Sequence, residues 1–219
     1  MTGTRRRSYD EGCIAAHALD LIGDRWALLV VRELLLGPRR FSELRAGLPG
    51  ISANILTRRL EEMASAGLVR AEAPGYGLTP AGEGLWPVLK ALCRWGGGQP
   101  GHDPTLFMSP TALMLSMRAM CARHRAGRHE VDFVLEGQAF TVVTGPGSYR
   151  LERGLAGAPL RFEGGTNAVA VAVYGPLPLH QTAAGLIRFD GGIEEGQAFL
   201  DLFSLHIAEG GAAPVSRSG

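Results

Sequence analysis

A polar helix face within residues 52–66 carries the side chains best suited to bind a partner. Apolar residues recur there at helical spacing and predict an amphipathic helix with a buried stripe of Leu56, Leu60 and Met63. The opposite side carries Asn54, Thr57, Arg58 and Glu61. Asn and Arg can form paired hydrogen bonds with base edges, and Ser52 at the helix start can meet a phosphate. The alternative to DNA contact is that this is the solvated polar face of an ordinary amphipathic helix.

The charge of the chain is unevenly distributed along its length. The formal net charge is only +1. Residues 1–60 nevertheless hold ten arginines against six acidic residues, whereas residues 100–219 hold nine against eleven. A basic first part favours an anionic partner such as nucleic acid. Arg59 falls on the inner side of the predicted helix, where we expect packing or a salt bridge.

The composition is that of a globular protein without a membrane partner. The chain has 219 residues, of which 46% are hydrophobic and 20% charged, an ordinary balance. No apolar run approaches the roughly 20 residues of a membrane helix. The first residues lack the apolar core of a secretory signal. We therefore expect a cytoplasmic protein.

No residue pattern points to catalysis, a metal or a cofactor. Cys13, Cys93 and Cys121 are too few and too scattered for a disulfide framework or a four-ligand zinc site. Cys13 and His17 could share a helix face, but two ligands are insufficient for a metal site. The sequence has no Ser-His-Asp order, nucleotide loop or paired-carboxylate motif. We expect no enzyme activity and no cofactor.

The elements around the polar helix follow a characteristic order. We expect helices at residues 13–22, 26–36, 41–46 and 52–66, strands at 68–71 and 76–78, and a helix at 79–95. A turn containing Gly and Pro joins the third and fourth helices. Two helices joined by a short turn and followed by a hairpin are the layout of a winged helix.

Over residues 13–96 the sequence resembles the HxlR-type, MarR-like winged-helix regulators. The resemblance rests on Cys13, on ALDLIGDRWALLVVRELLLGPRRFSELRAGLPGISANILTRRLEEMASAGLVR and on YGLTPAGEGLWPVLKALCRWG. It implies a bacterial transcription regulator, more often a repressor, that binds double-stranded operator DNA as a homodimer. Residues 52–66 would then be the recognition helix, and residues 68–78 the wing.

The resemblance also implies contacts outside the recognition helix. Arg39, Arg40 and Ser42 would lie near backbone phosphates, where contacts set affinity rather than sequence choice. The short wing has Arg70 as its one basic residue, which disfavours minor-groove contact. The candidate DNA contacts are Arg39, Arg40, Ser42, Ser52, Asn54, Thr57, Arg58 and Arg70. The implied dimer interface uses the first and fifth helices, through Leu19, Ile22, Leu85, Val88, Leu89 and Leu92.

Cys13 is the candidate redox residue. Several HxlR-type regulators carry a cysteine that senses oxidants or electrophiles at this position, and a helix N-terminus favours the thiolate. The alternative is that Cys13 is a small packing residue. Cys93 and Cys121 lie in apolar segments and are expected in the core.

A stretch rich in Gly and Pro at residues 96–110 predicts a domain boundary. We expect a DNA-binding and dimerisation domain at residues 1–98, a linker at 99–110, a second domain at 111–209 and a disordered tail at 210–219. The second domain should hold helices at 111–123 and 193–207 and strands at 131–136, 139–144, 149–153, 160–163 and 186–190. The alternating valines of residues 166–174 favour a further strand.

The second domain resembles the sterol-carrier-protein-like fold. The resemblance rests on VDFVLEGQAFTVVTGPGSYRLERG, APLRFEGGTNAVAVAVYG and TAAGLIRFDGGIEEGQAFLDLF. It implies a helix at residues 166–174, and we prefer the helix to the strand there. It also implies an apolar cavity, for which the candidates are Leu113, Met117, Met120, Phe133, Phe140, Val142, Phe199 and Phe203. The alternative is that these side chains are simply core.

The predicted fold class is α+β, with a winged helix-turn-helix domain followed by an α+β sterol-carrier-protein-like domain with an antiparallel sheet. The leading functional hypothesis is a homodimeric regulator whose second domain binds a small apolar ligand. A second hypothesis makes Cys13 the sensor and the second domain purely structural. A third is a lipid-carrier-like protein without DNA binding.

Overall fold

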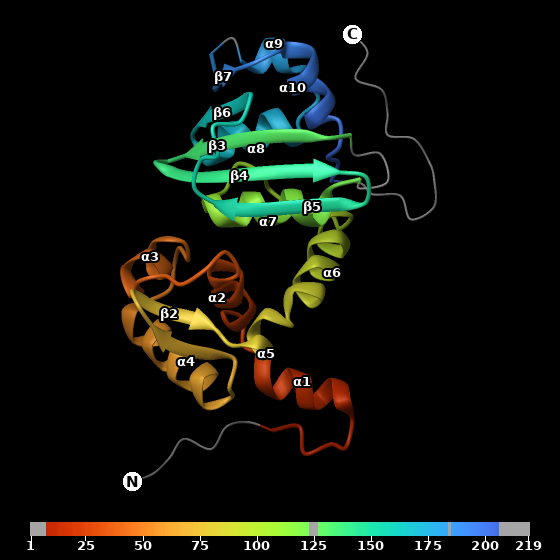
Figure 1. Cartoon of the computed structure of the whole chain (residues 1–219). Coiled ribbons are helices and arrows are strands. Elements are labelled where there is room, and N and C mark those ends of the chain that lie inside the picture. Colours follow the sequence, from red (N-terminus) through yellow and green to blue (C-terminus); the bar gives the residue numbers. More distant parts are fainter. Residues whose placement is uncertain (1–7, 123–126, 184, 206–219) are drawn as a thin grey trace. The chain divides into compact units, whose positions relative to one another are not determined.

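The chain folds into two compact units, which a computed structural model describes over residues 8–122, 127–183 and 185–205. The first unit ends at Pro87 and the second begins at Val88 (Figure 1). The predicted tail at residues 210–219 lies outside the described residues. The predicted domain limits at residues 98 and 111 stay predictions.

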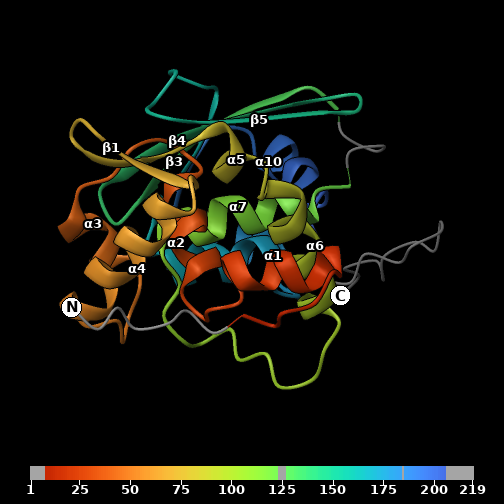
Figure 2. The same ribbon diagram turned by 90° about the horizontal axis from the view of Figure 1, so that it is seen from below.

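The first unit is a winged helix-turn-helix, as the sequence predicted (Figures 1 and 2). Its elements are α1 (Ile14–Ile22), α2 (Ala27–Leu34), α3 (Phe41–Ala46), α4 (Ala53–Ser65), β1 (Val69–Glu72), β2 (Gly75–Leu78) and α5 (Pro80–Glu83). The strands β1 and β2 pair antiparallel, with Val69 opposite Leu78. The core comes mainly from α2, α3 and α4, and its most deeply buried side chains include Val30, Leu34, Leu44, Leu56, Leu60 and Met63.

Local sequence sets both ends of α4. The Ser52 hydroxyl oxygen accepts a hydrogen bond from the backbone N–H of Ile55 at 3.3 Å, an ordinary N-terminal cap. At the other end Gly67 has a φ of +71°, a conformation that residues with a side chain rarely adopt. Ser52 and Gly67 thus set the two ends of α4, each of which lies within one residue of the predicted limits at residues 52 and 66.

The single helix predicted at residues 79–95 is wrong. The chain forms α5 and then a separate helix, α6 (Trp86–Gly97). Pro87 has no N–H to donate to the carbonyl of Glu83, and its ring would clash with that carbonyl in a continuous helix. Pro87 fits the first turn of a new helix, where a missing N–H costs nothing.

The second unit contains α6 and a five-stranded sheet with helices. The further elements are α7 (Pro110–Met120), β3 (His129–Leu135), β4 (Gln138–Gly145), β5 (Ser148–Arg153), β6 (Leu160–Gly164), α8 (Thr166–Tyr174), α9 (Leu179–Thr182), β7 (Arg188–Asp190) and α10 (Ile193–Leu200). The helix α6 belongs here because Arg94 Nε donates to the Ala119 carbonyl at 3.1 Å. α7 and α8 lie on one face of the sheet (Figures 1 and 2).

The sheet is mixed, not purely antiparallel as predicted. Its order is β5-β4-β3-β6-β7, and β3 and β6 run parallel with Val131 opposite Leu160. The strand β6 follows β5 in the chain but pairs with β3 on the side away from β4, so residues 154–159 cross the sheet and β6 runs in the direction of β3. The sterol-carrier-protein-like identity of this unit stays a prediction.

Residues 166–174 form the helix α8, so the preferred helix is confirmed and the alternating pattern was misleading. Val169 and Val173 lie four residues apart and are fully buried, whereas Val171 is exposed. A run of alternating Val and Ala can therefore satisfy a helical face as well as a strand.

One buried carboxylate, that of Asp132 on β3, holds the connection between β5 and β6. It accepts hydrogen bonds from the Thr141 hydroxyl at 2.6 Å and from the backbone N–H groups of Ala156, Gly157 and Ala158 at 3.0–3.1 Å. Burial by itself raises the pKa of Asp132, but the hydrogen bonds from Thr141 and the connection outweigh it and hold that pKa below its ordinary value.

We predict that Asp132→Asn lowers the free energy of unfolding at pH 7 by about 2 kcal/mol or more, because an amide cannot accept all four bonds. A lowered folded-state pKa stabilises the fold above the unfolded value of roughly 4 and loses its effect as the pH falls. The difference in the free energy of unfolding between the wild type and Asp132→Asn should therefore become smaller in acid. Urea unfolding at pH 7 and pH 3 measures it. The exposed Asp190→Asn serves as control, and equal effects of both would contradict the prediction.

Candidate nucleic-acid interface

The helix α4 buries its apolar stripe and exposes its polar face, as predicted. Leu56, Leu60 and Met63 are at most 2% exposed. On the other side Ser52, Asn54, Thr57 and Arg58 are all exposed. The Arg58 side chain is 65% exposed, and its Nε lies 3.8 Å from Glu62 Oε1, a loose contact that leaves the guanidinium available.

The neighbouring Arg59 has a different role. Its side chain is 11% exposed and forms ion pairs with Asp24 and with Glu62, each at 2.5 Å. Asp24 also accepts a hydrogen bond from the Trp26 backbone N–H at 2.8 Å. Of the two roles expected for Arg59, packing or a salt bridge, the structure shows the salt bridge. It ties α4 to the connection between α1 and α2 and so fixes which face α4 presents.

A second buried charge lies under the turn between α3 and α4, and sequence reasoning missed it. Glu33 is fully buried, and Arg32 Nε donates to its Oε1 at 3.0 Å. Arg32 also donates to the Gly47 carbonyl at 3.3 Å. A Cβ on Gly47 would lie 2.6 Å from Glu33 Oε2, so a larger residue in the turn would displace the Glu33 carboxylate. The available signal was an Arg-Glu pair inside an otherwise apolar helix.

The start of α3 exposes two of the three predicted phosphate contacts. Arg40 and Ser42 are exposed, and the Arg40 backbone N–H donates to Glu43 Oε2 at 2.7 Å. Arg39 is only 8% exposed, and its backbone exchanges two hydrogen bonds of 2.9 Å with Tyr76. Arg39 therefore joins the wing to α3 rather than offering its side chain. Arg45 is exposed on α3 and was not among the predicted contacts.

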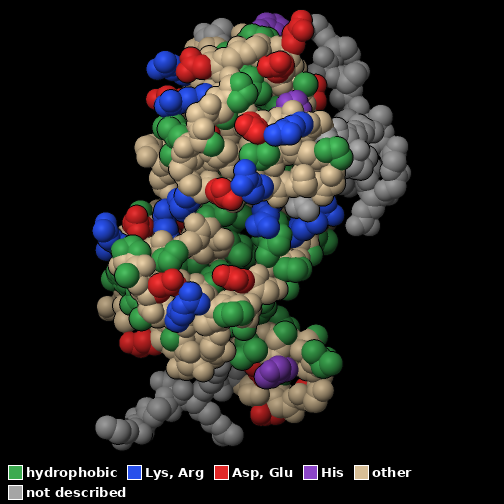
Figure 3. All heavy atoms as spheres, viewed as in Figure 1, with side chains coloured by type: hydrophobic (Ala, Val, Ile, Leu, Met, Phe, Trp, Pro, Cys, Tyr) green, Lys and Arg blue, Asp and Glu red, His purple; other side chains and the backbone are tan. Residues whose placement is uncertain are grey.

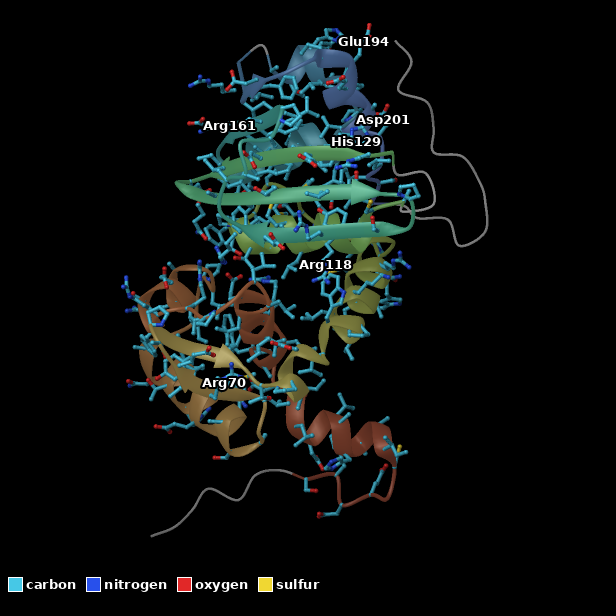
Figure 4. All side chains as sticks on the ribbon, viewed as in Figure 1. Arg70, Arg118, His129, Arg161, Glu194 and Asp201 are labelled. Atoms are coloured by element: carbon cyan, nitrogen blue, oxygen red, sulfur yellow. The ribbon has the colours of Figure 1, made fainter. Side chains whose placement is uncertain are left out.

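The wing arginine is engaged by its own hairpin. Arg70 Nη2 lies 2.8 Å from Glu72 Oε2, and Nη1 donates to the Leu78 carbonyl (Figure 4). Half of the side chain is exposed. An arginine already paired with a carboxylate has less to gain from a DNA groove, in line with the expectation from the short wing.

The helix α1 exposes apolar side chains, and Cys13 caps it. Ile14 is 87% and Leu19 49% exposed. Cys13 is exposed, and the backbone N–H groups of Ala16 and Ala15 lower the pKa of its thiol. Cys121 is buried and Cys93 half-buried.

The predicted dimer residues divide between exposed and covered positions. Val88 and Leu92 of α6 are 40% and 45% exposed, and Leu89 is buried. Ile22 and Leu85 are half-buried. Each of α1 and α6 thus carries exposed apolar side chains.

The predicted ligand residues are core. Each of the eight is at most 4% exposed: Leu113, Met117, Met120, Phe133, Phe140, Val142, Phe199 and Phe203. The rings of Phe133 and Phe162 stack at 5.3 Å, and those of Phe199 and Phe203 meet edge to face at 5.1 Å. Such contacts are what a packed core requires, and they lend no support to the predicted ligand.

Comparisons with known proteins match the first part of the chain. Residues 21–103 match the HxlR-like helix-turn-helix family. The uncharacterized HTH-type transcriptional regulator YvaP of Bacillus subtilis (strain 168) is 39% identical over 85 residues, which cover 36% of this chain and 79% of that protein. An uncharacterized HTH-type transcriptional regulator of Methanothermobacter thermautotrophicus is 38% identical over 98 residues, covering 42% and 75%.

Among solved structures, one titled as a MarR-family transcriptional regulator from Enterococcus faecalis V583 is 40% identical, with a TM-score of 0.34. The match covers 37% of this chain and 81% of that chain. Separately, no helix in the described part of this chain combines the length and apolar character needed to cross a membrane.

We predict that Arg59→Ala destabilises the fold and that Arg58→Ala leaves its stability nearly unchanged. Removing the half-buried Arg59 leaves two partly exposed carboxylates without their cation and should lower the free energy of unfolding by about 1–2 kcal/mol. Arg58→Ala should change it by less than about 0.5 kcal/mol, because the side chain is exposed. Chemical denaturation of the two variants measures both values. Similar values would mean that Arg59 does not hold α4 in place.

Proposed function

Because this chain belongs to the HxlR-like helix-turn-helix family of transcription regulators, we propose that it represses transcription by binding operator DNA as a homodimer. The observation that carries the proposal is the presentation of α4. Its polar face is exposed along its length, while Arg59 and the buried stripe hold the helix in one orientation. A rigid helix with Asn and Arg on its outer face suits the major groove.

In this proposal Asn54, Thr57 and Arg58 read base edges. Arg40, Ser42 and Ser52 contact phosphates at the starts of α3 and α4, and Arg45 joins them as an exposed cation on α3. Arg39 and Arg70 support the hairpin and do not contact DNA directly in this proposal. The Arg39 side chain is buried, and the Arg70 side chain is paired with Glu72.

The homodimer is proposed on the exposed apolar side chains of α1. Ile14 and Leu19 leave more apolar surface in water than we expect of a helix that packs only against its own chain. Exposed apolar side chains of this size can mark an interaction site, and a second copy would cover them. Two recognition helices related by a twofold axis would then read two half-sites.

We predict that the protein shifts DNA from upstream of its own gene in a mobility assay, and that the shift weakens when salt is raised. The double variant Asn54→Ala/Arg58→Ala should bind at least tenfold more weakly, since one paired base contact contributes about 1–3 kcal/mol. Ser65→Ala, on the last turn of α4, is the control and should bind normally. Unchanged binding by the double variant would overturn the assignment of α4.

We also predict that Leu19→Glu converts the dimer to a monomer at micromolar concentration, because the carboxylate would be buried unpaired in the interface. Light scattering coupled to gel filtration measures the mass. Leu155→Glu is matched for exposure, 48% against 49%, and should leave the mass unchanged. A wild-type protein with monomer mass would overturn the proposed homodimer.

A further inference from the structure

The strand β5 forms one edge of the sheet in the second unit (Figure 1). In the described part of the chain it pairs with one strand, β4, from Ser148 opposite Gly145 to Arg153 opposite Phe140. An edge strand presents a row of backbone donors and acceptors that can template another strand. The question is which strand could pair there.

The backbone of β5 directs Leu151 toward that edge. The N–H of Gly154 donates to the Ala139 carbonyl at 3.0 Å. In an antiparallel pair, hydrogen-bonded and non-hydrogen-bonded positions alternate. Arg150 and Glu152 therefore bond to β4, and Leu151 between them turns its N–H and C=O away from β4.

The charged side chains of β5 lie on the uncovered face of the sheet. Arg150 and Glu152 are 66% and 60% exposed, and within one strand they stand 3.5 Å apart. Arg153 points the other way and donates to Thr111 on α7 at 2.9 Å. Basic and acidic side chains are interspersed over this face of the sheet (Figure 3).

These charges make β5 complementary to itself in one register. If two copies pair antiparallel about Leu151, the two Leu151 residues face each other, and each Arg150 lies opposite Glu152 of the other copy. Moving the centre to Arg150 or to Glu152 would place two arginines or two glutamates directly opposite, which is destabilising. Arg150 and Glu152 would occupy a non-hydrogen-bonded pair, where side chains approach most closely.

We propose that β5 pairs with β5 of a second copy, antiparallel and centred on Leu151, so that two five-stranded sheets join into one. Six residues bury much less than the roughly 1,600 Å² of a standard interface. The pairing thus rests on the proposed homodimer, which raises the effective concentration of the second copy.

Disulfide trapping in the full chain tests the register. Leu151→Cys, with Cys13→Ser and Cys93→Ser to remove the accessible thiols, places the two new thiols opposite each other at the proposed centre and keeps Arg150 and Glu152. The Cα atoms of such a hydrogen-bonded pair lie about 5.5 Å apart, which suits a disulfide. Mild oxidation by copper phenanthroline should convert most of the protein to a covalent dimer. Ser148→Cys in the same background is the off-register control and should crosslink at least tenfold more slowly.

The outcomes separate this inference from the homodimer. Light scattering on the uncrosslinked parent reports the homodimer alone. A dimeric parent without crosslinking, or with equal crosslinking in both registers, overturns the β5 pairing only. A monomeric parent overturns the proposed homodimer, and register-specific crosslinking at raised concentration would still support β5 pairing.

Charge reversal provides an independent readout without cysteines. Arg150→Glu or Glu152→Arg alone sets like charges opposite each other, so the Leu151 amide should exchange hydrogen several-fold faster than in the wild type. Mixing the two variants restores opposite charges across the pair and should restore the slow exchange. Exchange that is the same in the separate and mixed samples would overturn the proposal.

Discussion

The orientation of α4 depends on one buried guanidinium. Arg59 bridges Asp24, before α2, and Glu62, one turn further along α4. Apolar packing alone would hold α4 against the core, but a stripe of Leu56, Leu60 and Met63 tolerates small rotations about the helix axis. Two directional ion pairs resist that rotation, because a guanidinium and a carboxylate prefer a fixed geometry. Everything on the outer face of α4 is placed by this restraint.

The two units use buried charges in the same way. In the first, Glu33 lies beneath the Gly47 turn, with Arg32 bonded to both. In the second, Asp132 gathers three backbone N–H groups of the connection between β5 and β6. In each case a carboxylate inside the fold lies beneath a connecting segment and is joined to its backbone, directly for Asp132 and through Arg32 for Glu33. A buried charge is tolerated because several donors replace its lost hydration.

Local signals conflicted at three places in the sequence. The helical spacing of apolar residues predicted one helix over residues 79–95, although the ring of Pro87 prevents a helix from continuing past it. Alternation favoured a strand at residues 166–174, although the same valines also line a helix face. The family resemblance placed Arg39 near phosphates, whereas in the structure its side chain is buried and its backbone pairs with Tyr76.

The sequence by itself determined the winged helix-turn-helix, the limits of α4 and the residues on its polar face. Those features follow from short-range rules: a 3.6-residue period, a serine cap and a glycine that can take a positive φ. Only the tertiary structure decided that Arg59 pairs with Asp24, that Glu33 lies beneath the turn and that β3 and β6 run parallel. Each of these depends on atoms brought together from distant positions, and spacing along a chain does not encode such contacts.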